Sequence, residues 1–264
     1  MITSAIKIVC ALTRLDTCVL VFLSLFLPVY FHSQDLFFSS IQALPVLTIC
    51  MCGFVINDLS DIEKDRTNHP LRPLPSNAIS ETSASIVYFL LLAISLITIK
   101  LNVDPANVYL YILLLVALIN YNFVVAYIPI LKTFYVAIVS LIPIFILSSI
   151  LHSEESILVV AISLFMFLLG REMLMDVEDV KGDAETFVKK IGVQRSENIA
   201  LSVKLCGSLL LSFLTRGTID IVIISLLAMA DFVFIYMWKK RWKRKVVIQL
   251  MKLQLLAGIY FLMP

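Results

Sequence analysis

An acidic segment at residues 57–65 is the first place in the chain where side chains could do chemistry. It reads Asn57-Asp58-Leu59-Ser60-Asp61-Ile62-Glu63-Lys64-Asp65. On a continuous helix, Asn57, Asp61 and Asp65 fall at i, i+4 and i+8, and Asp58 lies near the same face. Carboxylates that share a face repel one another and destabilise the helix, so the spacing predicts that a positive charge compensates for them.

A second acidic segment, at residues 176–183, repeats this arrangement. Asp176, Asp179 and Asp183 fall at i, i+3 and i+7, again on one helical face. In proteins, Mg²⁺ is commonly held by one or two carboxylates together with the phosphates of a substrate. Two acidic faces opposed across a helix bundle would therefore suit a diphosphate bridged by Mg²⁺. The alternative is a pair of solvated acidic loops that end two helices.

The composition of the rest of the chain is that of a polytopic membrane protein. Of its 264 residues, 60% are hydrophobic and 15% are charged, and the mean hydropathy is +0.98. Soluble domains carry about 25% charged residues, so this chain is neither an ordinary soluble globule nor disordered. Long apolar runs without strand-like alternation predict nine transmembrane helices in a single all-α domain over residues 1–264. The runs are 15–31, 36–56, 82–99, 105–131, 133–151, 156–170, 199–215, 217–238 and 246–263.

The basic residues are distributed unevenly between the two sides of this nine-span arrangement. Eighteen Lys and Arg residues lie on the side of the amino terminus and of the loops after spans two, four, six and eight, against two on the other side. The positive-inside rule makes the basic side cytoplasmic, and both acidic segments fall on it. The basic cluster at 239–245 fits a topogenic loop better than a site for anionic lipid. We find no nucleic-acid-binding signature.

The residues around the two acidic segments resemble the two signatures of the UbiA superfamily of intramembrane prenyltransferases. Asn57-Asp58-x-x-Asp61-x-x-x-Asp65, followed by Arg66-Thr67-Asn68-His69-Pro70-Leu71-Arg72-Pro73-Leu74-Pro75-Ser76, is similar to the first. Arg171-Glu172-x-x-x-Asp176-x-x-Asp179-x-x-Gly182-Asp183 is similar to the second. The resemblance implies nine helices around a central cavity with a cytoplasmic cap. It also implies Mg²⁺-dependent cleavage of an allylic isoprenoid diphosphate, with the isoprenoid tail among the helices and near membrane lipid.

The resemblance also implies a role for each residue of the two signatures. The first Mg²⁺–diphosphate site would consist of Asn57, Asp58, Asp61 and Asp65. The second would consist of Asp176, Asp179 and Asp183. Within these sets, Asp61 and Asp179 are the catalytic candidates, and Asn57 would also contact the prenyl diphosphate.

Four further residues outside the acidic segments match the family. Arg72, just past the first signature, would contact the diphosphate. The family has a Tyr shortly before a Leu-Lys pair in the fourth span, which Tyr127 and Leu131-Lys132 match. Lys132 would bind or activate the leaving group, because breaking an allylic C–O bond increases the negative charge on the diphosphate. Tyr127 and Lys132 are therefore the remaining catalytic candidates.

The sequence leaves the acceptor and the exact reaction open. An aromatic ring, a quinone precursor and a glycerol-phosphate alcohol are all acceptors compatible with the resemblance, and neither the prenyl length nor the oligomeric state follows from the residues. One alternative reaction is cyclisation, in which the substrate's own double bonds act as the nucleophile. Another reading is a transporter whose acidic residues bind ions. Transporter acids usually lie near the midplane of the membrane, whereas both acidic segments here are at span ends.

Two charged residues lie inside the expected spans and suggest an ion pair. Asp231 in span eight and Lys252 in span nine are at a similar depth, on spans joined by a short loop. A membrane-embedded charge is costly unless it is paired, so we expect Asp231 to pair with Lys252. Lys204 in span seven is the competing partner.

Overall fold

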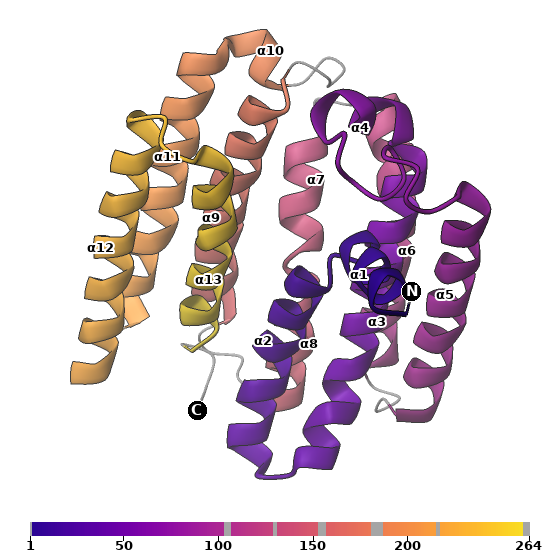
Figure 1. Ribbon diagram of the computed structural model, residues 1–264. Coiled ribbons are helices and arrows are strands. Elements are labelled where there is room, and N and C mark those ends of the chain that lie inside the picture. The colour runs from indigo at the N-terminus through magenta and orange to yellow at the C-terminus, as the bar shows by residue number, and fades with distance from the viewer. Residues whose placement is uncertain are drawn as a thin grey trace. The chain divides into compact units, whose positions relative to one another are not determined.

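The computed structural model describes residues 2–102, 107–128, 131–152, 157–180, 187–214 and 217–260. Within these ranges every regular element is a helix (Figure 1), which confirms the all-α class. The helices form two compact units, one from the residues up to Tyr127 and the other from the described residues that follow it. Each unit is described by itself below.

Unit 1 is built around one long central helix, α3. Its helices are α1 (Ile2–Leu12), α2 (Leu15–Ser33), α3 (Leu36–Ser60), α4 (Ile62–Asn68), α5 (Glu81–Asn102) and α6 (Val108–Tyr127). Helix α3 packs against α2, α5 and α6, and apolar residues on several sides of it, including Val46, Ile49 and Val55, are fully buried. Gly53 permits the approach of α6, because a Cβ atom there would lie 3.0 Å from the Leu118 side chain. Helix α3 therefore holds its polar carboxyl-terminal end in a fixed place.

Unit 2 is built around α9. Its helices are α7 (Lys132–Val139), α8 (Ile142–Leu151), α9 (Ile157–Glu178), α10 (Phe187–Ile191), α11 (Val193–Leu210), the 3-10 turn η2 (Leu211–Leu214), α12 (Thr218–Lys239) and α13 (Arg244–Tyr260). The backbones of α9 and α11 are in close contact at two glycines. A Cβ atom at Gly170 would lie 2.5 Å from the carbonyl oxygen of Ala200, and one at Gly207 would lie 2.6 Å from that of Ser163. Small residues at such crossings are typical of membrane helix pairs.

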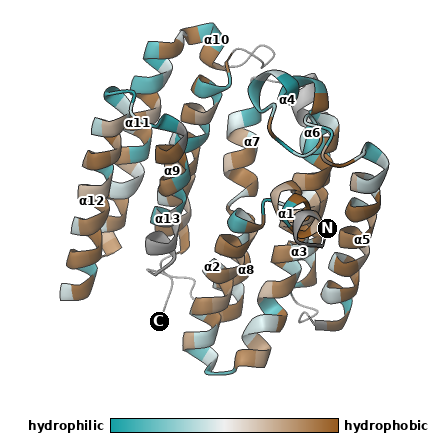
Figure 2. Ribbon diagram, viewed as in Figure 1, coloured by the Kyte–Doolittle hydropathy of each residue, from teal (hydrophilic) through white to brown (hydrophobic). Residues whose placement is uncertain are grey.

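Seven helical stretches in the described part of the chain are long and apolar enough to cross a membrane, which makes this an integral membrane protein. They are Leu15–Ser33, Leu36–Ser60, Glu81–Leu101, Lys132–Leu151, Ile157–Glu178, Val193–Leu214 and Thr218–Lys239. The two other expected spans coincide with α6 and α13. Hydrophobic residues predominate along the long helices (Figure 2), and many large apolar side chains are exposed, as contact with lipid requires. The count of nine, the central cavity and the cap stay predictions.

One expected span is not a single regular helix. The expected span at 133–151 is divided into two helices, because α7 ends at Val139 and α8 begins at Ile142. Proline is favoured in the first turn of a helix, where its missing N–H would have no intrahelical partner, and Pro143 lies in the first turn of α8. Ser140 and Leu141 between the two helices keep right-handed helical dihedrals, and Lys132–Leu151 remains one helical stretch that is long enough to cross a membrane.

Candidate functional site

The first acidic motif does not lie on one continuous helix. Helix α3 ends at Ser60 and α4 begins at Ile62, with Asp61 between them at φ −101° and ψ 14°. The hydroxyl of Ser60 donates a hydrogen bond to the carbonyl of Ile56 (3.0 Å), a bond that competes with the regular backbone pattern and often bends helices. The amide of Asp61 still donates to the carbonyl of Asn57 (2.9 Å), and that of Asp65 to Asp61 (2.8 Å). Asn57, Asp61 and Asp65 therefore keep the expected i, i+4 hydrogen bonds, although the helix is interrupted at Asp61.

Two arginines compensate for the buried carboxylates of this motif. Asp58 and Asp65 are each 2% exposed. Arg14 Nη2 lies 2.6 Å from Asp58 Oδ1, and Arg72 Nη1 lies 2.5 Å from Asp65 Oδ2 and 3.6 Å from Asp58 Oδ1. These two arginines place positive charge beside the acidic motif, and binding of Mg²⁺ by the same carboxylates stays a prediction.

Arg14 is a residue of the candidate site that the sequence analysis missed. It lies between α1 and α2 in a left-handed backbone conformation (φ 47°), and its guanidinium stacks over the Phe54 ring at 4.7 Å. Asp58 is 44 positions further along the chain, so no local spacing connects the two residues. The available signal was an isolated arginine at the start of the first expected span.

The remaining polar groups of the first motif suit a hard cation. The Asp61 carboxylate is partly exposed and lies 3.8 Å from the Lys64 ammonium group. The side-chain oxygen of Asn57 is buried and has no hydrogen-bond partner. A carboxylate and an amide oxygen are the ligands that Mg²⁺ prefers, together with substrate oxygens. No group of three or more His, Cys, Asp and Glu side chains is close enough to hold a metal among the described residues, so phosphate oxygens would have to complete the coordination.

The second acidic motif is anchored to α7. Asp176 is buried in the last turns of α9. Its Oδ1 lies 2.7 Å from Lys132 Nζ, and its Oδ2 accepts a hydrogen bond from Thr133 Oγ1 at 2.6 Å. The structure thus brings together Lys132 and Asp176, which the sequence assigned separately, and adds Thr133, which it missed.

The other expected residues of the second motif are only partly within the described chain. Asp179 follows the end of α9, and its amide donates to the carbonyl of Met175 at 3.0 Å, which continues the helical pattern by one residue. Asp183 lies outside the described residues. Tyr127 is the last residue of α6, and its side chain also falls outside the description. The expectation that the two acidic faces oppose one another stays a prediction.

The membrane-embedded Asp231 pairs with Lys204, which the sequence analysis named as the competing partner. Lys204 and Asp231 are 2% and 1% exposed and form a buried ion pair between α11 and α12. Gln254 on α13 donates a hydrogen bond to Asp231 Oδ1 at 3.1 Å. The Lys204 ammonium group also lies 4.5 Å from the centre of the Phe167 ring. The structure thus shows the competing pair, with Gln254 of α13 at the same carboxylate oxygen, and the pairing of Asp231 with Lys252 stays a prediction.

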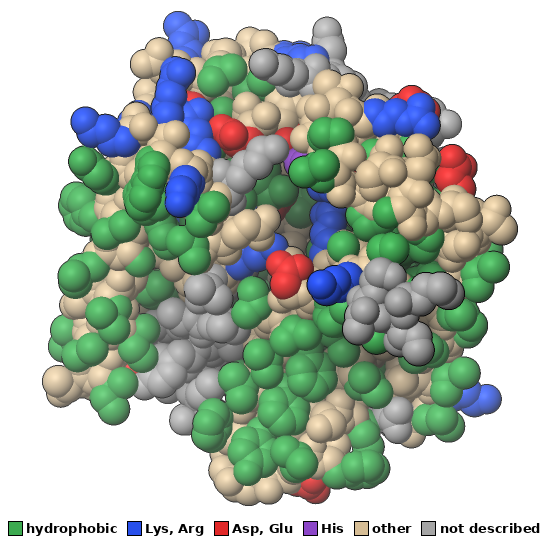
Figure 3. Space-filling model, in the orientation of Figure 1, with side chains coloured by type: hydrophobic (Ala, Val, Ile, Leu, Met, Phe, Trp, Pro, Cys, Tyr) green, Lys and Arg blue, Asp and Glu red, His purple; other side chains and the backbone are tan. Residues whose placement is uncertain are grey.

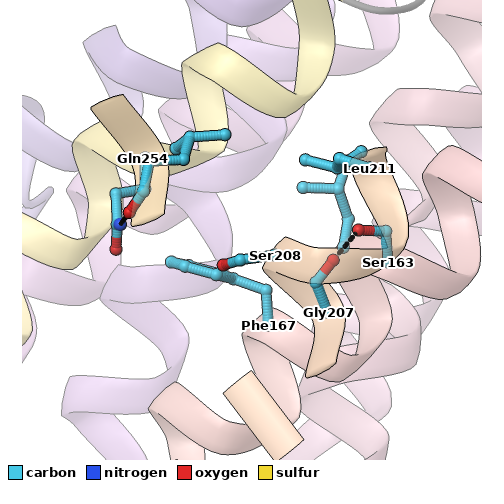
Figure 4. Close-up of a pocket in the computed structure, with 8 residues that line it drawn as sticks. Ser163, Phe167, Gly207, Ser208, Leu211 and Gln254 are labelled. Carbon is cyan, nitrogen blue, oxygen red and sulfur yellow. Dashed lines mark hydrogen bonds between the residues drawn. The ribbon is translucent and has the colours of Figure 1, made fainter. Parts of the chain in front are cut away.

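A cavity beside this ion pair is not the expected reaction site. It is a small, partly open pocket between α9, α11, η2, α12 and α13, with a volume of only about 10 Å³ (Figure 4), which is about the space that one water molecule needs. Its lining residues are Ser163, Leu164, Phe167, Gly207, Ser208, Leu211, Leu227 and Gln254. None of them is charged, and none belongs to either acidic motif. The cavity therefore has no group that could bind a diphosphate by charge.

Comparison with known proteins agrees with the signatures. The model of the UbiA prenyltransferase family matches residues 15–256. A digeranylgeranylglyceryl phosphate synthase of Sulfolobus acidocaldarius is 31% identical over 61% of this chain and 59% of its own length. The enzyme of the same name from Methanococcus aeolicus is 33% identical over 64% of this chain and 61% of its own length. The matched region thus spans about three fifths of the length of each of these curated relatives.

Two solved structures share the fold. One, of a digeranylgeranylglyceryl phosphate synthase in membranes, superposes with a TM-score of 0.69 at 22% identity and covers 98% of both chains. The other is a UbiA homologue from Archaeoglobus fulgidus bound to GPP and Mg²⁺, with a TM-score of 0.69 at 15% identity, covering 97% of this chain and 99% of its own. At these identities the superpositions show a common fold.

Proposed function

This chain belongs to the UbiA prenyltransferase family, and we propose that it transfers the prenyl group of an isoprenoid diphosphate to a glycerol-phosphate alcohol within the membrane. The observation that carries the proposal is the pairing of buried aspartates with cationic side chains in both acidic motifs. Lys132 contacts Asp176 at 2.7 Å, and Arg72 contacts Asp65 at 2.5 Å. The cation of such a pair can contact a phosphate oxygen in place of the carboxylate, and binding of a diphosphate requires contacts of this kind.

In this proposal the acidic and amide side chains of the two motifs hold Mg²⁺. Asn57, Asp58, Asp61, Asp65, Asp176 and Asp179 would hold Mg²⁺, together with Asp183. When bound, Mg²⁺ supplies positive charge that neutralises the diphosphate oxygens. The oxygen ligands present, including the unpartnered Asn57 side-chain oxygen, are of the type that Mg²⁺ binds.

Lys132 and Arg72 would act on the leaving group. As the allylic C–O bond breaks, the electron pair stays on the diphosphate, and positive charge develops on the prenyl carbon. The negative charge on the diphosphate is larger in the transition state than in the bound substrate, so nearby cations stabilise the transition state more. They therefore lower the activation barrier in addition to binding the substrate. The hydroxyl oxygen of the acceptor then forms the new C–O bond and loses its proton. Tyr127 stays a candidate for a catalytic role near this step.

The choice of acceptor rests on the relatives. Both relatives described above are named digeranylgeranylglyceryl phosphate synthases, and that name describes a prenylated glycerol phosphate. A glycerol-phosphate alcohol is therefore preferred to an aromatic ring or a quinone precursor. The cytoplasmic location of both acidic motifs rests on the uneven distribution of basic residues along the sequence.

The experiment is a transfer assay on the purified protein in detergent. Geranylgeranyl diphosphate is incubated with geranylgeranylglyceryl phosphate, with Mg²⁺ or with EDTA, and the lipid products are identified by mass spectrometry. We expect an ether-linked product that forms only with Mg²⁺, and none from the Asp61→Ala variant. Transfer to an aromatic acceptor alone would contradict the proposed acceptor. A cyclic hydrocarbon formed without acceptor, and no transfer product, would contradict the proposed reaction.

A further inference from the structure

One basic residue of the loop between α12 and α13 differs from its neighbours. Lys and Arg side chains gather at the end of unit 2 where this loop lies (Figure 3). Lys240, Arg241 and Lys243 are exposed, as a topogenic loop predicts. Arg244, the first residue of α13, is only 15% exposed. Arg241 and Lys243 have positive φ angles of 53° and 42°, which non-glycine residues seldom adopt, so the loop turns sharply just before Arg244.

The guanidinium of Arg244 connects the ends of four helices. Its Nη2 lies 2.9 Å from Glu197 Oε1 in the first turns of α11, and its Nη1 lies 3.3 Å from Glu178 Oε1 at the end of α9. Its Nε donates to the carbonyl of Trp238 near the end of α12 at 3.4 Å. Its Cζ also stacks 4.5 Å from the centre of the Trp238 ring, which is fully buried. An arginine can make all these contacts at once because its planar group is both a multiple donor and a stacking surface.

Glu178 links this cluster to the second acidic motif. It is the last residue of α9 and lies between Asp176 and Asp179 in sequence. At 100° per residue, Glu178 is turned about 200° from Asp176 around the helix axis. Asp176 is held by Lys132 and Thr133 of α7, so the end of α9 is fixed from two different sides.

We propose that Arg244 is a positioning residue for the second acidic motif. By pairing with Glu178 and Glu197, it fixes the last turn of α9 and keeps these two carboxylates away from metal binding. Without Arg244, two partly buried carboxylates would face the same space without their shared cation. The end of α9 would move to expose them, and the motif would lose its alignment. This inference rests on the proposed function, since it concerns how that reaction is aligned.

The test compares variants of the full-length protein in the transfer assay, with kcat, the Mg²⁺ concentration for half-maximal rate and the melting temperature as readouts. Arg244→Met keeps the length of the side chain and removes the charge. We expect kcat to fall by about tenfold or more, as small misplacements of reacting groups commonly cause, and the Mg²⁺ requirement to rise. Arg244→Lys should recover part of the loss, because one ammonium group can reach one glutamate but cannot bridge two and stack on Trp238.

Two matched controls separate positioning from stability. Arg241→Met removes an exposed cation of the same loop and should leave all three readouts unchanged. Asp231→Asn breaks the buried pair with Lys204 and should lower the melting temperature while kcat stays within about twofold. If Arg244→Met lowers only the melting temperature, as Asp231→Asn does, the positioning role is wrong.

A further pair of variants covers the case in which Arg244→Met does not fold. Glu178→Gln removes the link to α9, and Glu197→Gln removes the link to α11. We expect Glu178→Gln to change kcat and the Mg²⁺ requirement more than Glu197→Gln does, and equal or absent effects would overturn the inference. An active wild type with unaffected variants contradicts this inference alone. A wild type that transfers no prenyl group contradicts the proposed function, and this inference with it.

Discussion

Replacing Asp231 by Asn should destabilise the protein strongly through one buried ion pair. Asp231 and Lys204 are almost completely buried, and in the structure the carboxylate also accepts a hydrogen bond from Gln254. The substitution leaves the Lys204 ammonium group in the interior without its counter-charge. Removing one partner of a buried pair costs about 3–5 kcal/mol. For a chain of this size, each kcal/mol lowers the melting temperature by about 2–4 °C, so we expect a decrease of about 6–20 °C.

A double-mutant cycle identifies the partner of Asp231. Lys204→Met alone should also be strongly destabilising, whereas Lys204→Met combined with Asp231→Leu should approach the wild type, because an apolar pair can replace a buried ion pair at little cost. The coupling energy should therefore be at least about 2 kcal/mol. Thermal unfolding in detergent, followed by intrinsic fluorescence, measures each variant.

The same cycle with Lys252 tests the partner that the sequence favoured. We expect its coupling with Asp231 to be smaller than that of Lys204, because the structure places the Lys204 ammonium group in direct contact with the carboxylate. Additive effects of Lys204→Met and Asp231→Leu would refute the reasoning, because they would show that the two charges do not stabilise each other. A large coupling with Lys252 would restore the original pairing.

The remaining predictions concern the two motifs and the helix crossing. Asp61→Ala and Asp179→Ala should each abolish transfer while the melting temperature in detergent stays near that of the wild type; activity within tenfold of wild type would remove that residue from the Mg²⁺ site. Lys132→Met should lower kcat by more than it weakens diphosphate binding, because the charge of the leaving group grows in the transition state; unchanged turnover with weaker binding would make Lys132 a simple anchor. Gly170→Ala should destabilise the protein by about 1–3 kcal/mol, since its Cβ atom would lie 2.5 Å from the Ala200 carbonyl. Gly217→Ala is the control in thermal unfolding, because among the described residues no heavy atom beyond the adjoining backbone lies within 4 Å of the added Cβ.

The sequence by itself determined the class of the protein and the places where its charges gather. Apolar runs of about 20 residues predict membrane-spanning helices because a bilayer demands that length. Seven of the expected spans correspond to helices that are long and apolar enough. The two acidic motifs were also visible, because helical spacing is local and acidic residues are rare in such a chain. Their described residues lie at helix ends in the structure, the first motif across the break between α3 and α4 and the second at the end of α9.

Only the tertiary structure decided which charges meet. Arg14 and Asp58 are 44 positions apart, as are Lys132 and Asp176. The structure pairs Asp231 with Lys204. It also buries Arg244 against two glutamates, whereas the neighbouring basic residues of its loop are exposed. These choices depend on how far each helix is rotated about its axis and on how closely its neighbour approaches, as Gly170 permits for α9 and α11. Periodicity places side chains on the faces of one helix, but packing against other helices determines which faces touch.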